Sequence, residues 1–450
     1  MKTAAAKTPP SPDTKLFTGV MREFQRDPLR YITNCARNHG DIVLTRFLYF
    51  HCYFIFHPDF IEEILVTQSR NFIKGASFRT PLFERIAGKG LLSSEGDFWK
   101  RQRRLAQPAF HRQRIHSYAE TMVDYSLRFI SKWQAGKTLD IHQAMMELAL
   151  EVVVKTLFDT DITNHTNEVG KAMEVVVEPF ASQATFKWII DNHFPTPTHR
   201  RFYRSAQTLD NIIFKMIHDR RMSGEDRGDL LSMLLAARDE DDSSMDNQQL
   251  RDEVMNIFIA GHETTALALT WSWYSLSQHP DVEKKLHEEL DSVLGNRPPT
   301  LEDLPNLIYT EKIVKEVLRL YPPAWVLNRE AVEECEIGGY RFAPKSQFYG
   351  FQWVIHRDPR FFPEPDHFIP ERWTEDFVKQ LPRYAYFPFG GGPRLCIGNS
   401  FAMMEAVLIL ATIAQQFRLR LLPEQNIHPT PSISLRPNRE ILVQLEKLTI

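Results

Sequence analysis

One cysteine, Cys396, lies in the segment of this 450-residue sequence that has the clearest chemical potential. Residues 387–398 are Phe-Pro-Phe-Gly-Gly-Gly-Pro-Arg-Leu-Cys-Ile-Gly, and three glycines with two prolines exclude a regular helix or strand. Apolar residues at helical spacing follow over 399–418, so the cysteine is expected where a tight loop enters a helix. The free amides and positive end of a helix favour a thiolate there. Such a thiolate can be a nucleophile or an axial ligand to iron, and the glycines would let a large flat ligand approach the backbone.

A second polar segment interrupts a long apolar helical pattern over 246–278. Residues 260–265 are Ala-Gly-His-Glu-Thr-Thr, and a glycine, an acid and two hydroxyls in the middle of a buried helix reduce its stability. Local costs of this kind tend to mark functional sites. Asp246, with Gln249 three residues later, predicts the N-terminal cap of this helix.

Two residue pairs have spacings that place both members on one helix face. Trp99 and Arg103 are four residues apart, and Glu316 and Arg319 are three apart. A further arginine, Arg372, follows in the segment 370–373, Pro-Glu-Arg-Trp.

Together these segments resemble landmarks of the cytochrome P450 family. Residues 389–398 match its haem-binding signature F-x-x-G-x-R-x-C-x-G, and residues 260–265 resemble its A-G-x-D/E-T-T oxygen-binding motif. The segments at 99–103, 316–319 and 370–373 are similar to its W-x-x-x-R helix, its E-x-x-R helix and its P-E-R-F-like segment, here ending in Trp. They follow the order of the family and span most of the chain.

The resemblance implies that Cys396 is the proximal thiolate ligand of haem b, which pushes electron density onto the iron and favours O–O cleavage. Arginines would pair with the haem propionates, and Phe389 would shield the thiolate. The cofactor-binding residues implied in this way are Trp99, Arg103, Ala260, Gly261, Arg329, Phe389, Arg394 and Gly398.

The same resemblance assigns proton chemistry to the long helix. Thr264 would hydrogen-bond dioxygen or a proton-delivering water, Glu263 would relay protons from solvent, and Ala260 and Gly261 would let haem and O₂ approach. His262 is not expected to bind the iron. A buried cluster of Glu316, Arg319 and Arg372 is implied as structural, and its loss would leave an unpaired buried charge.

The periodicities predict a mainly α fold with small β-sheets, in which the haem lies between the long central helix and the cysteine loop. Residues 1–20 are expected to form an extended N-terminal arm, and 21–450 a single haem domain. Helices are predicted near 115–135, 143–158, 205–221, 247–278, 281–294 and 310–320, and strands near 42–56, 338–342, 418–422 and 441–445.

Composition excludes several protein classes. The net charge is −3, which argues against nucleic-acid binding, and no stretch approaches 18 apolar residues, so no transmembrane anchor is expected. The first 20 residues lack the apolar core of a signal peptide. Four cysteines without a C-x-x-C pair suit a reducing cytosol, so we expect a cytoplasmic protein, and we expect it to be a monomer.

The predicted activity is a haem-thiolate monooxygenase that hydroxylates or epoxidises a lipophilic substrate, with fatty acids or other lipids favoured and terpenoids or steroids next. The chain has no G-x-G-x-x-G before a helix and no room for a flavin domain, so NAD(P)H would act indirectly through a ferredoxin, a flavodoxin or a reductase. Two interpretations remain for Lys100, Arg101 and Arg104: a patch on which the acidic electron donor docks, or a solvated helix face.

Alternatives remain open at this level. A peroxide-driven or isomerising haem-thiolate enzyme usually lacks the acid–threonine pair that 263–264 supply, and a non-catalytic haem-binding protein would need no proton relay. A cysteine hydrolase would leave the other landmarks unexplained.

The apolar segments expected to line the pocket are 78–92, 180–190, Phe258, Ala260, 324–327 and 433–435.

Overall fold

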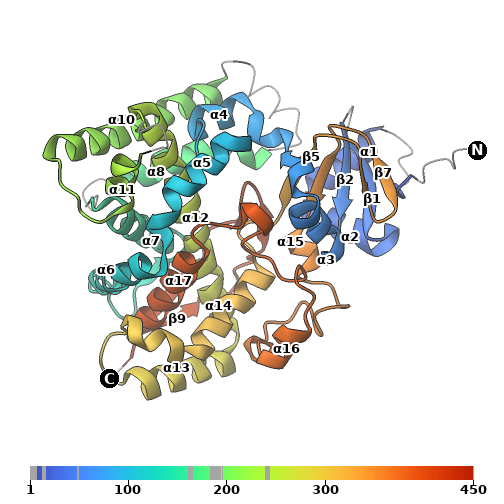
Figure 1. Ribbon diagram of the computed structural model, residues 1–450. Coiled ribbons are helices and arrows are strands. Elements are labelled where there is room, and N and C mark those ends of the chain that lie inside the picture. The colour runs from blue at the N-terminus through green and yellow to red at the C-terminus, as the bar shows by residue number, and fades with distance from the viewer. Residues whose placement is uncertain are drawn as a thin grey trace, which may run out of the picture.

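The computed structural model describes residues 8–12, 17–47, 50–160, 166–182, 194, 196–238 and 244–448. It is a single mainly α domain with small sheets, as the sequence predicted (Figure 1). Most helices gather on the left of Figure 1, whereas β1, β2 and their neighbours form a smaller β-rich part on the right, next to the N-terminus. Among the described residues no helix is both long and apolar enough to cross a membrane.

The helices follow one another along most of the chain. They are α1 (Phe17–Arg26), α2 (Pro28–His39), α3 (Pro58–Glu62), α4 (Pro81–Ala87), α5 (Gly96–Ala106), α6 (Arg112–Ile130), α7 (Ile141–Phe158), α8 (Thr166–Val177), α10 (Pro197–Ser223), α11 (Leu230–Ala236), α12 (Asn247–Gln278), α13 (Pro280–Leu294), α14 (Ile308–Leu320), α15 (Gln352–Ile355), α16 (Glu375–Gln380) and α17 (Asn399–Ala414).

The strands form one mixed sheet and three small antiparallel ones. They are β1 (Ile42–Phe47), β2 (Phe50–Ile55), β3 (Phe72–Lys74), β4 (Thr138–Asp140), β5 (Leu327–Ala331), β6 (Cys335–Ile337), β7 (Tyr340–Phe342), β8 (Gln347–Gly350), β9 (Phe417–Leu421), β10 (Pro429–Pro431), β11 (Leu435–Pro437) and β12 (Leu442–Lys447).

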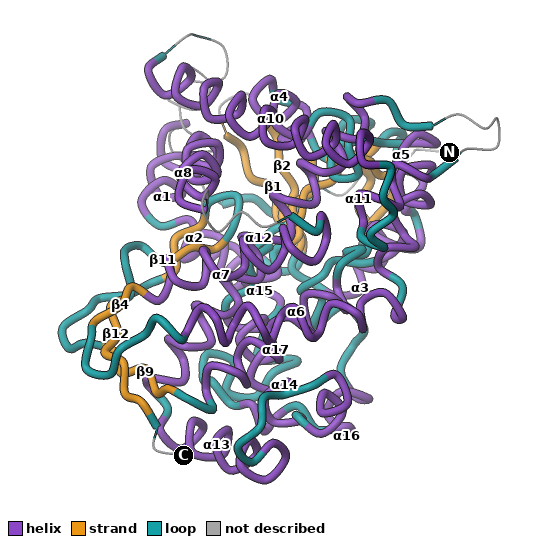
Figure 2. Tube along the Cα trace, turned by 90° about the vertical axis from the view of Figure 1, so that its left-hand side faces the viewer, coloured by secondary structure: helices purple, strands orange, loops and turns teal. Residues whose placement is uncertain are grey.

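The mixed sheet has the strand order β1-β2-β8-β5-β3, and the smaller ones are β4-β12-β9, β10-β11 and β6-β7. Figure 2 shows β4, β9 and β12 together at one edge near the C-terminus, away from β1 and β2. The sheets therefore lie around the helical core, whose largest apolar cluster is built from α6, α7, α12, α14 and α17.

The predicted N-terminal arm was too long. Residues 17–20 are the first turn of α1, in which Val20 is buried and already belongs to the folded core. Only the part before α1 is extended where it is described, and there the carbonyl of Pro10 accepts a hydrogen bond of 2.8 Å from the amide of Leu44 in β1.

The helix α12 runs through the centre of the helical part and matches the predicted 247–278. Its cap is confirmed, because the Asp246 carboxylate accepts a hydrogen bond of 2.7 Å from the amide of Gln249. The helix is buried on nearly all sides, which is typical of a helix enclosed by others. Solvent-accessible residues in its middle are confined to 259–261 and 264, so one face is open there.

Helix α10 begins eight residues before its predicted start, because Thr196 caps the amide of His199 and Pro197 occupies the first turn. Helix α17 ends at Ala414 rather than Arg418, since Phe417 already pairs in the sheet with β12.

Candidate functional site

The loop before α17 depends on three successive glycines, because of backbone conformation, close packing or both. Gly390 and Gly392 have φ angles of 71° and 62°, in the left-handed region that disfavours other residues. A Cβ atom on Gly391 would lie 2.3 Å from the ring of Tyr384, and one on Gly392 would lie 1.8 Å from the carbonyl oxygen of Leu65. The loop therefore packs so closely that side chains at 391 and 392 have no room, whereas Gly390 is required for its backbone conformation alone.

Hydrogen bonds fix the position of Cys396 within this loop. Its amide donates to the carbonyl of Phe389 at 3.0 Å, and the amide of Phe387 donates to the ring of His356 at 3.0 Å. Burial lowers the pKa of His356 to about 3, so the ring is neutral and can accept at ordinary pH. His356 belongs to none of the motifs described above, and the structure shows that it anchors the start of the loop.

Opposing effects act on the ionisation of Cys396, for which the thiolate stays a prediction. Burial raises the pKa of the thiol, against the lowering effects of the Gly398 amide and the charges of Arg103 and Lys74. Burial of the sulfur therefore opposes the helix end, whereas a coordinated metal deprotonates a thiol outright. Cys396 is nevertheless exposed, unlike the other three free cysteines, which are buried.

Four cationic side chains surround the cysteine loop. Arg103 donates to the carbonyl of Leu395 at 2.9 Å, and the guanidinium of Arg394 lies 3.9 Å from the centre of the Trp99 ring. Lys74 and Arg329 stand directly opposite each other in the antiparallel pair β3–β5. Like charges in that position destabilise a sheet.

One carboxylate faces these cations. Glu95 accepts a hydrogen bond from Arg394 and another, of 2.7 Å, from the backbone amide of Lys74. Burial, followed by the charges of Arg329 and Arg394, lowers the pKa of Lys74 to about 7, and burial with Arg394 lowers that of Arg329 to about 10. The sequence reasoning missed Lys74 and Glu95, because neither belongs to a motif and only the strand pairing brings them here.

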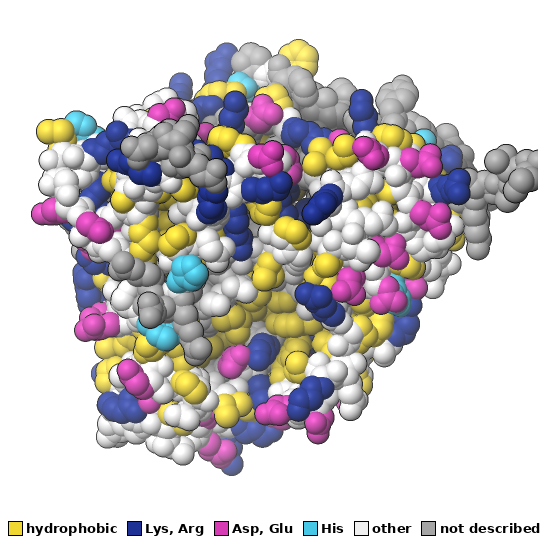
Figure 3. All heavy atoms as spheres, in the orientation of Figure 1, with side chains coloured by type: hydrophobic (Ala, Val, Ile, Leu, Met, Phe, Trp, Pro, Cys, Tyr) yellow, Lys and Arg dark blue, Asp and Glu magenta, His cyan; other side chains and the backbone are white. Residues whose placement is uncertain are grey.

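This arrangement fits a haem with two propionates. Four cations with one carboxylate leave an excess of positive charge, and the buried Nη1 of Arg394 has no hydrogen-bond partner among the described residues. A group with two negative charges would neutralise the excess charge and would accept a hydrogen bond from Nη1 of Arg394. The single accessible thiol, Cys396, supplies a ligand for iron, and the close-packed glycine loop holds it in place. Figure 3 shows Lys and Arg side chains around a hollow between α5 and the β-rich part.

The open face of α12 carries part of the predicted oxygen motif. Ala260 is exposed, and the Thr264 hydroxyl donates to the carbonyl of Ala260 at 2.7 Å, a helix back-bond that leaves its oxygen able to accept. A Cβ on Gly261 would lie 3.5 Å from Val153 of α7, so this glycine lacks its side chain on the α7 side. Close approach at Gly261 therefore stays a prediction.

Glu263 and His262 point away from this face. Glu263 is 4% exposed and accepts hydrogen bonds from Ser434 and Arg436, near the C-terminus. His262 is buried and its Nε2 lies 3.0 Å from the carbonyl of Met146 in α7, which agrees with the expectation that it does not bind iron. No hydrogen bond joins the Glu263 and Thr264 side chains among the described contacts.

A second acid reaches α12 from α17. The Thr265 hydroxyl donates to Glu405 at 3.1 Å, and Glu405 is fully buried. Burial raises the pKa of Glu405 to about 8, so it is largely protonated at neutral pH. An acid within the apolar pattern of 399–414 was the sequence signal that could have identified it.

The predicted cluster behind the loop is confirmed. Glu316 and Arg319 have no exposed side-chain surface and lie 2.8 Å apart, and Arg372 lies 2.9 Å from the same carboxylate. Arg319 also donates to the carbonyls of His356, Pro365 and His367, and Trp373 donates its indole N–H to Glu316 at 2.9 Å. The cluster ties α14 to the segment 356–373.

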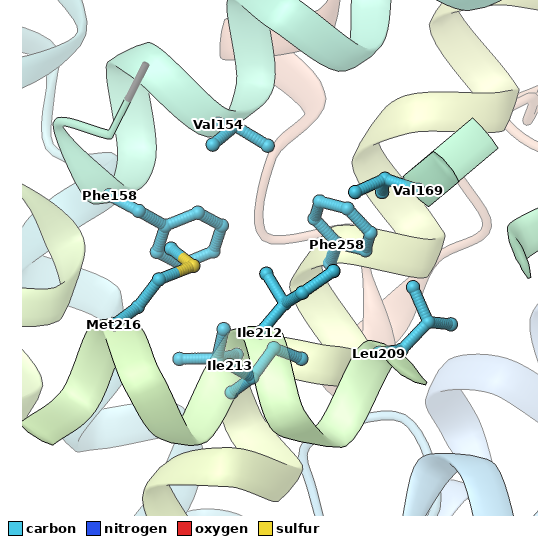
Figure 4. A pocket seen from close by; sticks show the side chains of 9 residues that line it. Val154, Phe158, Val169, Leu209, Ile212, Ile213, Met216 and Phe258 are labelled. Carbon is cyan, nitrogen blue, oxygen red and sulfur yellow. The ribbon is translucent and has the colours of Figure 1, made fainter. Parts of the chain in front are cut away.

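Phe258 does not line the open face of α12. It points into a small apolar cavity between α7, α8, α10 and α12 (Figure 4). Two residues along a helix are about 200° apart, so Ala260 lies on the opposite side of α12. Of the other segments expected to line the pocket, Ala324 is exposed and Ser434 is buried against Glu263, whereas residues 183–190 lie outside the described residues.

Comparisons with known proteins agree with this geometry. The family model described as Cytochrome P450 matches residues 9–445. Cyclooctatin synthase of Streptomyces melanosporofaciens is 40% identical over 91% of this chain and 89% of its own length. Cyclooctat-9-en-7-ol 5-monooxygenase of the same organism is 37% identical over 92% and 90%, and pentalenene oxygenase of Streptomyces avermitilis is 32% identical over 98% and 97%.

Proposed function

The chain belongs to the cytochrome P450 family and is a monooxygenase, and from this premise we propose that it oxidises a cyclic terpenoid. The observation that carries the proposal is the similarity, over nine tenths of the chain or more, to relatives named for cyclooctatin, cyclooctat-9-en-7-ol and pentalenene. The motifs of the sequence favour fatty acids or other lipids over terpenoids. These relatives support the reverse order, with terpenoids first.

The residues of this chain have distinct roles in the proposal. Cys396 would hold the iron, and Arg103, Arg329, Arg394 and Lys74 would hold the propionates. The bound haem supplies reductive activation of dioxygen, for which the thiolate is the electron-donating ligand. Thr264 would orient a proton donor on the open face of α12, where its oxygen is able to accept a hydrogen bond.

Electrons would arrive on the face formed by α5 and the cysteine loop. Phe98 and Leu395 are exposed large apolar residues there, and the basic residues Lys100, Arg101 and Arg104 lie on the same helix as Phe98. An apolar centre with a basic border suits an acidic protein donor such as a ferredoxin or flavodoxin, itself reduced by NAD(P)H. Lys100→Glu should weaken reduction by such a donor most at low salt, and no change there would contradict this docking face.

The substrate proposal is tested by binding and turnover. Purified holoprotein is titrated with cyclic terpene hydrocarbons, their alcohols, steroids and long-chain fatty acids, and the shift of the haem absorption band is recorded. The expected result is the tightest binding for a cyclic terpene or its alcohol, followed by a product one oxygen atom heavier when a donor system is added. Tightest binding and oxidation of fatty acids, with no terpenoid response, would overturn the proposal.

A further inference from the structure

Glu95 lies where three elements of the site meet. It directly precedes α5, and its carbonyl accepts a hydrogen bond of 3.2 Å from the amide of Trp99 in that helix. Its side chain reaches the other two elements. Oε1 accepts a hydrogen bond of 2.7 Å from the backbone amide of Lys74 in β3, and Oε2 accepts one from Arg394 in the cysteine loop. Three of the four cations of the site, Lys74, Arg103 and Arg394, belong to these three elements.

The helix that Glu95 precedes does not account for these contacts. A side chain at this position usually caps the free amides of the first turn, and Glu is not among the preferred caps. The Glu95 side chain makes no capping hydrogen bond to α5. Instead it binds residues 21 positions earlier and 299 positions later in the chain. A residue that departs from the local rule in this way points to a role between elements.

The contacts of Arg394 fix its guanidinium on one side. Nη2 donates to the Glu95 carboxylate and, at 2.9 Å, to the carbonyl of Ser94, while the guanidinium lies 3.9 Å from the centre of the Trp99 ring. The side chain of Arg394 is 16% exposed and that of Glu95 30%, so water screens this ion pair less than a surface pair. Because Nη2 and one face of the guanidinium are held, the unpartnered Nη1 keeps one direction.

The end of β3 is held through the backbone of Lys74. Its amide donates to Glu95, and its carbonyl accepts a hydrogen bond of 2.7 Å from Arg79, which itself pairs with Glu330 of β5. Arg329 stands directly opposite Lys74 in the sheet, and like charges in that position repel. Contacts on both sides of the Lys74 backbone therefore keep this cation in place against the repulsion.

We propose that Glu95 is a positioning residue for the haem propionates, which holds Arg394 and the end of β3 so that their cations meet the cofactor in one arrangement. This role rests on the haem-binding part of the proposed function and is independent of the substrate. Glu95 exerts it through Arg394, so its effect on the cofactor should depend on that arginine.

Resonance Raman spectra of the holoprotein, without substrate or electron donor, test this role. The propionate bending band of haem shifts when hydrogen bonding to the propionates changes. Gln has one carbonyl oxygen and no charge, so in Glu95→Gln it cannot accept from Arg394 and the Lys74 amide together. The band should shift in the same direction as in Arg394→Gln, and the double variant should shift no further than Arg394→Gln.

Asp97→Asn is the matched control. Asp97 is a carboxylate in the first turn of the same helix, but its side chain is 96% exposed and pairs with Lys100 at 2.8 Å. Its removal should leave the band unchanged. A purely structural role of Glu95 would lower the melting temperature of Glu95→Gln without moving the band.

Release of haem provides a second readout. Transfer of haem from the holoprotein to an excess of apomyoglobin should be severalfold faster in Glu95→Gln than in the parent protein and unchanged in Asp97→Asn. An unshifted band in Glu95→Gln, or equal or slower release, would overturn the proposal. If Glu95→Gln does not retain haem, Glu95→Asp makes the same comparison, because its carboxylate is one methylene shorter. A parent protein that binds no haem would instead contradict the proposed function, so the two failures are distinguishable.

Discussion

Trp373 shows how one residue changes the strength of a buried network. The P-E-R-F-like segment of the family ends here in Trp, and the indole N–H donates to the fully buried carboxylate of Glu316 at 2.9 Å. That carboxylate also binds Arg319 and Arg372. A fourth donor from Ile369, at 3.0 Å, completes its contacts, so little of its hydrogen-bonding capacity is left unused.

Trp373→Phe should therefore destabilise the protein although Phe is the usual residue. Loss of a hydrogen bond to a buried charged group should lower the free energy of unfolding by about 1.5–3 kcal/mol, measured by urea titration. Trp133→Phe is a matched control, because Trp133 packs against Phe129 and Phe417 and no hydrogen bond of its indole is described. Equal effects of the two substitutions would contradict the role of the indole N–H.

Glu405 makes stability depend on pH in a defined direction. Burial raises the pKa of Glu405 from 4.5 to about 8, so between these values the folded chain binds a proton that the unfolded chain releases. The contribution of Glu405 to the free energy of unfolding is present at low pH and is lost as the pH rises toward 8. Glu405→Gln has no titrating group at this position, so the variant does not lose stability in this way.

Relative to the parent protein, Glu405→Gln should therefore gain stability as the pH rises from about 5 to 8, by up to about 1.4 kcal/mol per pH unit. Urea titrations at several pH values measure the difference. A difference that stays constant with pH would show that Glu405 is already ionised in the folded protein.

At the scale of elements, the cysteine loop is defined by what packs against it. The turn at 392–394 contacts the short helical segment Glu63–Thr67, and the missing Cβ of Gly392 would clash with the Leu65 carbonyl there. The loop therefore depends on a segment more than 300 residues earlier in the chain.

Gly392→Ala should displace the loop and abolish haem incorporation, observed as loss of the reduced-plus-CO band of thiolate-ligated haem. Gly136→Ala is the control, since Gly136 also has a positive φ, of 79°, but an added Cβ would meet nothing within 4 Å. That substitution should cost only the backbone strain, about 1–2 kcal/mol, and keep the band. Retention of the band in Gly392→Ala would mean that the loop can move without losing the site.

At the scale of the whole molecule, the cation cluster links stability to the cofactor. Lys74 and Arg329 come from two strands of one sheet, and Arg103 and Arg394 come from α5 and the cysteine loop, so several elements repel one another without a dianion between them. Haem binding should raise the melting temperature, as expected for a ligand bound by the folded state alone.

Lys74→Met separates the effect of the cation cluster on the stability of the haem-free protein from its effect on haem affinity. It should raise the stability of the haem-free protein, because one unmatched charge is removed, and it should weaken haem affinity, because a partner of the propionates is lost. Thermal unfolding of the haem-free protein and transfer of haem to a competing acceptor measure the two quantities. Lower stability in both forms would contradict the charge argument.

The sequence by itself determined the family, the mainly α fold, the long central helix with its cap and the cysteine loop. These depend on local spacing: the signature 389–398, the motif 260–265 and the pairs at 316–319 and 99–103 are each contained within a few turns of chain. The substrate order favoured by the sequence changed only when relatives named for cyclic compounds were compared.

Only the tertiary structure decided which charges meet. Lys74 joins Arg329 through strand pairing, Glu263 turns to Arg436 rather than to Thr264, and Phe258 lines a cavity among four helices. Each partner is separated by tens to hundreds of residues, and no local pattern encodes such contacts. A side chain's direction and its pKa depend on what packs around it, so the roles of these residues emerge only after the chain has folded.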